Sequence, residues 1–409
     1  STTCDNSVII GYEAAGESGT AMSGNDNVMI GYQAGYAHVG GYNNVLIGRQ
    51  AGTAITSGAR NVFIGYQAGD GHDAETYNIG IGEGALGGAI NGGEYNVAIG
   101  PLSLDALTTA DKITAIGYQA GSAHTTGANC LFAGYQAGLA NTTGASNIAI
   151  GPNALDQCDT ESHNIAIGND AMHGSVAGGE YNTVMGSLAG DAITSGDGNQ
   201  LLGYYTGSDI TTGYDNTYVG RVNGTANGNS IGVNTTTGYR NTLIGTYMNT
   251  AAADTTHAIG IGYAMAIAAN DFSFGKPSNV VTNDFDADAD WSRSSDIRLK
   301  RNIENTTLGL DFINDLRPIR FQWKPSNEVP EIMKSEYNEE NQKNLDYVSH
   351  GFIAQEVKEA IDKHGDPTFG GWHLDKTDNE TQRIKKNMFV MPLIKAVQEL
   401  SATVTTLQQ

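Results

Sequence analysis

Apolar and polar positions alternate in short runs along most of this chain, and each run ends at a glycine. Val28-Met29-Ile30-Gly31 is one example, and the pattern returns at sixteen glycines that are mostly 17 or 18 residues apart. These glycines are Gly11, Gly31, Gly48, Gly65, Gly82, Gly100, Gly117, Gly134, Gly151, Gly168, Gly186, Gly203, Gly220, Gly232, Gly245 and Gly262. Alternation over three residues predicts a short strand, and a steady period of this length predicts stacked coils.

The first and third side chains of each run lie on one face of the predicted strand, because successive side chains point to opposite sides. We expect Val28 and Ile30, and their equivalents in the other repeats, to stack inside the coil. Polar segments such as Thr56-Ser57-Gly58 supply turns, so each coil is expected to contain two short strands and two turns.

Two polar or aromatic rows accompany the glycines. Asparagine stands four positions before the glycine in eleven repeats, where a short amide can bond the turn backbone and the neighbouring coils. Its members are Asn27, Asn44, Asn61, Asn78, Asn96, Asn147, Asn164, Asn182, Asn199, Asn216 and Asn241. Tyrosine directly follows the glycine in six repeats, at Tyr12, Tyr32, Tyr66, Tyr118, Tyr135 and Tyr204. We predict an asparagine ladder and a tyrosine ladder, the latter packing within or between chains.

The repeat ends after Gly262, which divides the chain into three regions. We place a repetitive shaft at 1–265, a connector at 266–294 and a C-terminal domain at 295–409. The C-terminal region mixes helical spacing with strand alternation, so we predict a small α+β domain. Its last segment spaces apolar residues by four and three, as in a coiled-coil helix. These residues are Leu393, Val397, Leu400, Val404 and Leu407.

Charge and core size bear on the partners. Residues 1–290 contain 26 of the 44 acidic residues and only 6 of the 22 basic residues. Such a surface repels phosphate backbones and anionic membranes, so we expect neither nucleic acid as a partner nor membrane insertion. A short coil buries little apolar surface against a backbone entropy cost of about 1–2 kcal/mol per residue. Association of identical chains offsets this deficit, and we predict a homotrimer.

The repeated phrase Asn-x-x-Ile-Gly-x-x-Ala-Gly resembles the head domains of trimeric autotransporter adhesins and related shafts of bacteriophage tail fibres. The resemblance covers about residues 5–265 and implies a parallel β-roll. The fold expected for the chain is therefore mainly β. It comprises a trimeric parallel β-roll or β-helix shaft of sixteen coils, followed by a small α+β domain that ends in a short coiled-coil helix.

Three ordered segments of the C-terminal region, at 295–303, 351–357 and 393–400, resemble the endosialidase-type intramolecular chaperone family. Members of that family lie at the C-terminus of phage tail spikes and fibres. They trimerise, assist the folding of the β-structure upstream, and then cut themselves off. The resemblance therefore implies a folding module that removes itself after assembly.

Carried over by position, the resemblance implies Ser295 as the nucleophile, Lys300 as the general base and Ser294–Ser295 as the scissile bond. A lysine activates a serine hydroxyl only in its neutral form, which nearby cations favour, and Arg298 and Arg301 are close in sequence. Five-residue spacing places Ser295 and Lys300 on one face of neither a helix nor a strand. A turn or tertiary packing must bring them together.

We expect a structural and host-attachment component of a phage tail fibre or similar virion appendage, folded in the host cytoplasm before assembly. The sequence lacks an initiator Met and a signal peptide, so we interpret it as a fragment of a longer protein. The expected receptor is a host-surface glycan or outer-surface protein. The alternatives are a tail-spike depolymerase acting on host surface polysaccharide and a cell-surface trimeric adhesin.

No cofactor and no metal ion are expected. The acidic run 284–290 alternates oxygen ligands but lacks the sharp-turn glycine and the closing glutamate of an EF-hand. The three cysteines show no zinc-site spacing. The chemistry that we expect is therefore the cleavage of the chain by itself.

Overall fold

The structure is a computed structural model in which the chain forms two compact units, Ser1–Ser294 and Ser295–Gln409. It describes residues 6–16, 22–220, 231–277, 279–286, 296–333, 336–340, 345–375 and 381–408. Ser294 and Ser295 thus lie outside the described residues, as do residues 287–290 of the acidic run.

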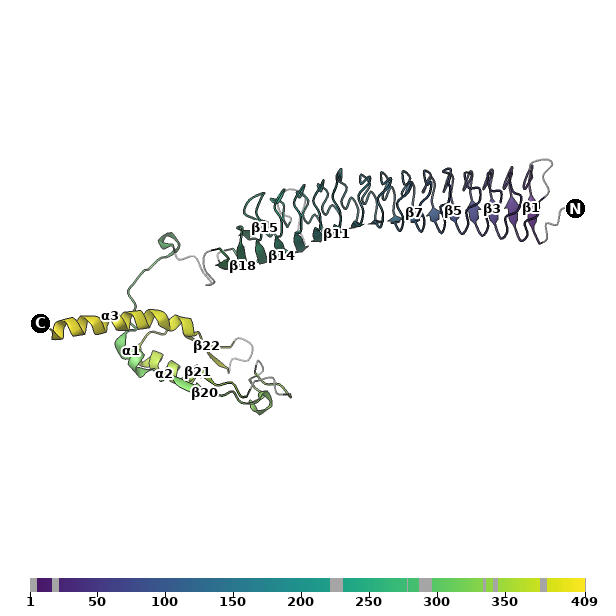
Figure 1. Cartoon of the computed structure of the whole chain (residues 1–409). Coiled ribbons are helices and arrows are strands. Elements are labelled where there is room, and N and C mark those ends of the chain that lie inside the picture. The colour runs from purple at the N-terminus through teal and green to yellow at the C-terminus, as the bar shows by residue number, and fades with distance from the viewer. Residues whose placement is uncertain are drawn as a thin grey trace. The chain divides into compact units, whose positions relative to one another are not determined.

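The N-terminal unit is a β-solenoid in which successive coils add one strand each to a 17-stranded sheet. Figure 1 shows these strands stacked along one side of the coils. The strands of the sheet are β1 (Val8–Ile10), β2 (Val28–Ile30), β3 (Val45–Ile47), β4 (Val62–Ile64), β5 (Ile79–Ile81), β6 (Val97–Ile99), β7 (Thr114–Ile116), β8 (Leu131–Ala133), β9 (Ile148–Ile150), β10 (Ile165–Ile167), β11 (Thr183–Met185), β12 (Gln200–Leu202), β13 (Thr217–Gly220), β14 (Thr242–Thr246), β16 (Ile259–Tyr263), β18 (Asp271–Lys276) and β19 (Asn279–Asp284). All neighbours pair in parallel except β18 and β19, which are antiparallel. The expected mainly β solenoid is confirmed.

The strand faces are opposite to the expectation. Met29, the middle residue of β2, is fully buried, whereas Val28 and Ile30 are only partly buried. The same pattern holds in the following strands, where Leu46 and Phe63 point inward. The prediction that the first and third side chains form the core was therefore wrong, because the coil interior is filled by the middle residue and by side chains from the turns.

The asparagine ladder is confirmed. All eleven predicted residues are fully buried, and each amide links its coil to the next. In one step, Asn44 donates from its backbone N–H to Asn27 Oδ1 at 2.9 Å and from Nδ2 to the carbonyl of Gly58 at 2.8 Å. Ile113 and Cys130 occupy the same row and interrupt it, and Cys130 Sγ still accepts from the backbone N–H of Asn147. The asparagine side chains thus provide hydrogen-bond partners for buried backbone groups of the turn, and no second strand is needed there.

Each coil has one strand rather than two over most of the solenoid. A second sheet occurs within the described residues only near the C-terminal end, where β15 (Asn249–Thr250) pairs with β17 (Ala266–Ile267). Turns and the asparagine amides satisfy the remaining backbone.

Gly232 is not a strand glycine. The strand glycines adopt φ near +140°, as at Gly48 (φ +137°), whereas Gly232 has φ +74° and matches the turn glycine Gly207 (φ +64°). Gly220 pairs directly with Gly245, so the sequence advances 25 residues between these paired glycines instead of about 17. Fifteen of the sixteen predicted glycines therefore end strands, and Gly232 is the exception.

The sheet continues beyond the boundary expected at residue 265. Strand β18 pairs in parallel with β16, which places Gly262 beside Gly275, and β19 folds back on β18. Part of the expected connector 266–294 thus completes the sheet. The sequence period is lost here because the coil between Gly262 and Gly275 is shorter.

The C-terminal unit is a small α+β domain. It contains η1 (Ile297–Leu299), α1 (Leu310–Asp315), β20 (Ile319–Phe321), η2 (Ser326–Glu328), β21 (Ser349–Gly351), α2 (Ala354–His364), β22 (Trp372–Leu374), β23 (Gln382–Ile384), η3 (Lys386–Phe389) and α3 (Val390–Leu407). Its core is formed by Leu308, Phe312, Val357, Ala360, Ile361 and Phe389. Phe312 is fully buried and stacks on Phe389 at 6.3 Å, so α1 and η3 share one aromatic centre.

Candidate functional site

The candidate cleavage site lies at the start of the C-terminal unit. The proposed nucleophile Ser295 and the scissile bond Ser294–Ser295 are outside the described residues. The proposed base Lys300 directly follows the short 3-10 helix η1, and the side chains of residues 296–300 are all exposed. The short helix η1 lies between the two positions, and the side chain of Lys300 is exposed in the single chain.

Asp296 organises this turn. Its carboxylate caps η1 by accepting from the backbone N–H of Arg298 at 2.8 Å, and it pairs with the Arg298 guanidinium at 2.6 Å. These bonds from Arg298 lower the pKa of Asp296, and the charge of Lys300 adds to the shift. The positive charge of Arg298 is thus compensated by Asp296.

The other two sequence segments, 351–357 and 393–400, contribute to the core and to the helix contacts of the same domain. Segment 351–357 spans the end of β21 and the start of α2, and Val357 enters the core. Glu399 of α3 accepts from the backbone N–H of Leu310 at 2.7 Å and so caps the N-terminus of α1. A Cβ at Gly309 would lie 2.3 Å from Glu399 Oε2, which explains the glycine before this helix.

Comparison with protein families decides the identity of this unit. Residues 295–366 match the family model described as chaperone of endosialidase. The C-terminal unit is an endosialidase-type chaperone domain. A domain of this family implies trimerisation. Its match begins at Ser295, where the second compact unit also begins. No match was found among curated proteins or among solved structures.

Helix α3 of the chaperone domain exposes an apolar seam. Its inner face carries the buried Pro392 and Ala396. The five predicted heptad residues lie on another face, and their exposed fractions run from 46% for Val404 to 81% for Leu407. The seam therefore does not pack on the described part of its own domain. This exposure favours contact with another chain over internal packing.

Part of the predicted tyrosine ladder is present on the solenoid surface. Tyr12 stacks on Tyr32 at 5.6 Å, and Tyr118 stacks on Tyr135 at 5.5 Å. Between Tyr32 and Tyr66 the row contains Arg49, whose guanidinium lies over both rings. The ladder is thus continued by cation–π contacts where tyrosine is missing.

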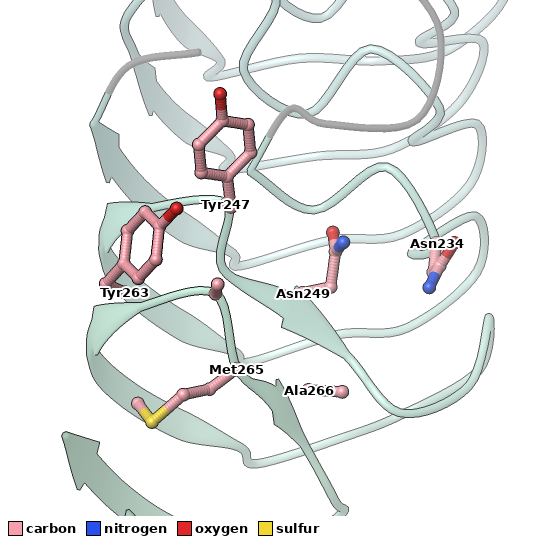
Figure 2. A pocket seen from close by; sticks show the side chains of 7 residues that line it. Asn234, Tyr247, Asn249, Tyr263, Met265 and Ala266 are labelled. Carbon is pink, nitrogen blue, oxygen red and sulfur yellow. The ribbon is translucent and has the colours of Figure 1, made fainter. Parts of the chain in front are cut away.

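A pocket of about 410 Å³ opens near the C-terminal end of the solenoid. Figure 2 shows Tyr247 and Tyr263 on one side of it and Asn249 and Asn234 on the other. The two rings meet edge to face at 5.6 Å, and Asn249 Oδ1 is buried without a hydrogen-bond partner among the described residues. Phenol and amide groups of this kind suit a polar ligand such as a sugar, and no sequence pattern predicted the pocket.

A row of half-buried carboxylates follows another corner of the solenoid. Burial raises the pKa of Asp105, Asp156 and Asp209, and it raises the pKa of Asp191 to about 6. Within the described ranges, no group of three or more His, Cys, Asp or Glu side chains is arranged to hold a metal ion. In the same ranges, no helix is both long and apolar enough to cross a bilayer.

Proposed function

We propose that this chain is a structural and host-attachment component of a phage tail fibre or spike. In this proposal the chaperone domain drives trimerisation and folding of the solenoid, and then cleaves itself off at Ser294–Ser295. The observation that carries it is the match to the chaperone family, which starts at Ser295 directly after a long repetitive solenoid.

A repetitive solenoid gains from a chaperone because its coils are nearly interchangeable. Each strand pairs with a neighbour about 17 residues away, for example Val28 with Val45 and Val45 with Val62. If three such chains associate, a slip of one whole coil places apolar residues against apolar residues again. A domain that joins the three C-termini first fixes the register before the coils close.

The cleavage proposed here is a self-directed serine reaction with no external substrate. Neutral Lys300 removes the proton from Ser295 Oγ, which attacks the carbonyl carbon of Ser294. The Ser294–Ser295 C–N bond breaks, the proton passes to the nitrogen of Ser295, and an ester on Oγ remains. Water then hydrolyses this ester and restores the serine hydroxyl. Because residues 296–300 are exposed in the single chain, we propose that trimer assembly completes the environment of Lys300.

A denaturing gel after native expression tests the cleavage. The wild-type chain should give a fragment that begins at Ser295, identified by N-terminal sequencing. Ser295→Ala and Lys300→Ala should each abolish the cut, and Lys300→Arg, which keeps the charge but cannot act as a base at neutral pH, should abolish it too. Lys324→Ala, at an exposed position of the same domain away from the proposed dyad, serves as the matched control and should still cut. Cleavage in both Ala variants would rule out this dyad.

Host attachment is the second part of the proposal, and the pocket at Tyr247 and Tyr263 supports it. Binding to host-surface glycans should weaken at least tenfold in Tyr263→Ala. Loss of one ring that contacts the ligand costs about 1.4 kcal/mol, which corresponds to a factor of ten in affinity. Tyr95→Ala, an exposed ring elsewhere on the solenoid, is the control. Degradation of the polysaccharide, with loss in Asp191→Asn, would instead favour the depolymerase alternative.

A further inference from the structure

An apolar stripe runs along the outside of the solenoid sheet. It consists of the first and third residues of the parallel strands, which we call the outer stripe. Its third-position residues are Ile10, Ile30, Ile47, Ile64, Ile81, Ile99, Ile116, Ala133, Ile150, Ile167, Met185, Leu202, Val219, Ile244, Ile261 and Phe274. The strand register places each of them directly beside the next, so the row is unbroken from β1 to β18.

The outer stripe is poor in polar groups and remains accessible. Ile116 exposes 44% and Leu202 exposes 47% of their surface, and no charged residue occupies a first or third position in β1–β14 or β16. If each outward side chain leaves roughly 50 Å² exposed, fifteen strands present on the order of 1,500 Å² per chain, about twice the ~800 Å² per partner of a standard interface. Contiguous apolar surface of this size marks an interface.

We propose that the outer stripe is the surface by which three copies of this chain pack together, in parallel and in register, along the length of the solenoid. This inference rests on the trimeric assembly proposed above. It identifies the contact face and assigns the strand isoleucines to the contact between chains rather than to the core of each chain.

The pattern of the stripe selects a copy of this chain as its occupant. The row repeats about every 17 residues over its whole length, so a partner must present apolar groups with the same spacing over the same distance. An identical solenoid meets that condition at every coil. Chains joined at their C-terminal domains run in the same direction, and a three-fold axis along the solenoid places equal coils at equal heights.

The narrowness of the stripe suits three chains. Each three-residue strand offers two outward side chains, such as Val97 and Ile99 in β6. In a three-fold ring every chain contacts two neighbours through different surfaces, so one row can face each neighbour.

Cysteine cross-linking of the full chain tests this arrangement. Ile116→Cys and Ile150→Cys place a thiol in the stripe with little change in polarity, and Thr126→Cys places one in an exposed turn outside the strands. Oxidation of the two thiols with diamide, which is reduced in the reaction, should join two of the three stripe-variant chains in each trimer by a disulfide and give a covalent two-chain product on a non-reducing gel. The Thr126→Cys variant should not form the cross-linked product. All variants carry Cys4→Ser, and the Cys4→Ser protein, in which Cys130 and Cys158 are buried, is the blank.

A second measurement needs no substitution. Met185 belongs to the stripe and exposes 38% of its surface in the single chain, whereas Met29 is fully buried inside the coil. In the native assembly, peroxide should oxidise Met185 as slowly as Met29. Fast oxidation of Met185 would overturn the proposal.

Light scattering separates the possible failures. A trimer that cross-links through the stripe supports the inference. A trimer in which neither stripe variant cross-links, or only Thr126→Cys does, overturns the inference and leaves the proposed function intact. A monomer overturns both.

Discussion

His72 occupies an inward position of the solenoid at which the neighbouring coils carry Ile55 and Ile90. It packs against Phe63 at 4.6 Å, and neither ring nitrogen has a hydrogen-bond partner among the described residues. Burial lowers the pKa of His72 to about 3 and that of His38, in the same row, to about 4. These side chains are therefore held neutral where an unfolded histidine takes up a proton.

The solenoid should lose stability as the pH falls below 6.5. The unfolded state binds protons near pH 6.5, whereas folded His72 does not until about pH 3, so the stability that His72 contributes is lost between these values. At pH 5 this costs about 2 kcal/mol. The His72→Ile variant should lose about 2 kcal/mol less folding stability than the wild type when the pH falls from 7 to 5. The shift of the urea midpoint between these two pH values measures the difference. His163→Asn, at an exposed position, should leave the shift unchanged, and an unaltered shift in His72→Ile would contradict the assignment.

Residue rows of this kind were only partly predictable. The asparagine ladder followed from sequence because a buried amide is needed in every coil, and nearly every coil shows it. The histidine positions were not recognised, since their row mixes His38 and His72 with apolar residues such as Ile55. An isolated histidine carries no periodic signal in one sequence.

In the strands, the residue type at the inward position varies from coil to coil, whereas the outer stripe is mostly Val and Ile. Neighbouring coils compensate for one another in volume. Phe63 fills its own coil and lies over Gly80, where an added Cβ would come within 3.0 Å of Phe63 Cδ1. Coils with Ala98 inside are filled from the turns by Leu104 and Leu107. The interior is therefore packed across coils and not within each one.

Gly80→Ala tests this packing. Gly80 does not have a positive φ, so the cost arises from crowding against Phe63 and the Ala85 carbonyl, and we expect destabilisation of about 1–3 kcal/mol. Phe63→Leu should restore part of the loss in the double variant. Gly40→Ala, where a Cβ would make only an ordinary contact with Ser23 Oγ at 3.8 Å, should be nearly neutral in the same thermal or urea unfolding assay. Equal effects at Gly40 and Gly80 would exclude crowding as the cause.

The choice of strand face shows where sequence reasoning fails. Alternation established which residues share a face, but not which face is buried, because a shift by one residue exchanges the two sides. The regular Val and Ile positions suggested a core. Their regularity instead belongs to the outer stripe, and the inner row is irregular because Met29, Phe63 and Gly80 share space with turn residues.

The α3 seam allows a direct test of assembly. Val390, Val397 and Val404 take the a positions, and leucines take the d positions. In isolated parallel coiled coils this combination favours two strands, so the three-fold order is expected to come from the whole domain. Leu400→Lys should cause loss of the trimer in light scattering, whereas Gln398→Lys, on the same helix outside the seam, should not. A Leu400→Lys trimer of unchanged stability would mean that the seam is not an interface.

For the whole molecule, the two units differ in what they need from each other. The chaperone domain has its own core, whereas the solenoid exposes its outer stripe until chains associate. A chain ending at Ser294 should therefore fail to form trimers after refolding and should aggregate. A solenoid that has assembled first and then lost the domain should keep its trimeric mass. Efficient refolding of the shortened chain would show that the domain is dispensable.

The candidate site was predictable mainly through its resemblance to a family. Composition and spacing alone cannot distinguish Ser295 and Lys300 from chance neighbours. The described structure adds the cap by Asp296 and its pairing with Arg298, which no sequence pattern indicated. In our proposal, trimer assembly completes the environment of Lys300, and one sequence contains no pattern for such contacts between chains.

The long coil between Gly220 and Gly245 has a consequence for variation. The strands on either side pair in normal register although this coil has 25 residues instead of about 17, and a later coil between Gly262 and Gly275 is shorter still. The number of residues between paired strands can therefore change without displacing the sheet. New recognition loops can be grafted between such strands, by evolution or by design, while the fibre that presents them stays the same.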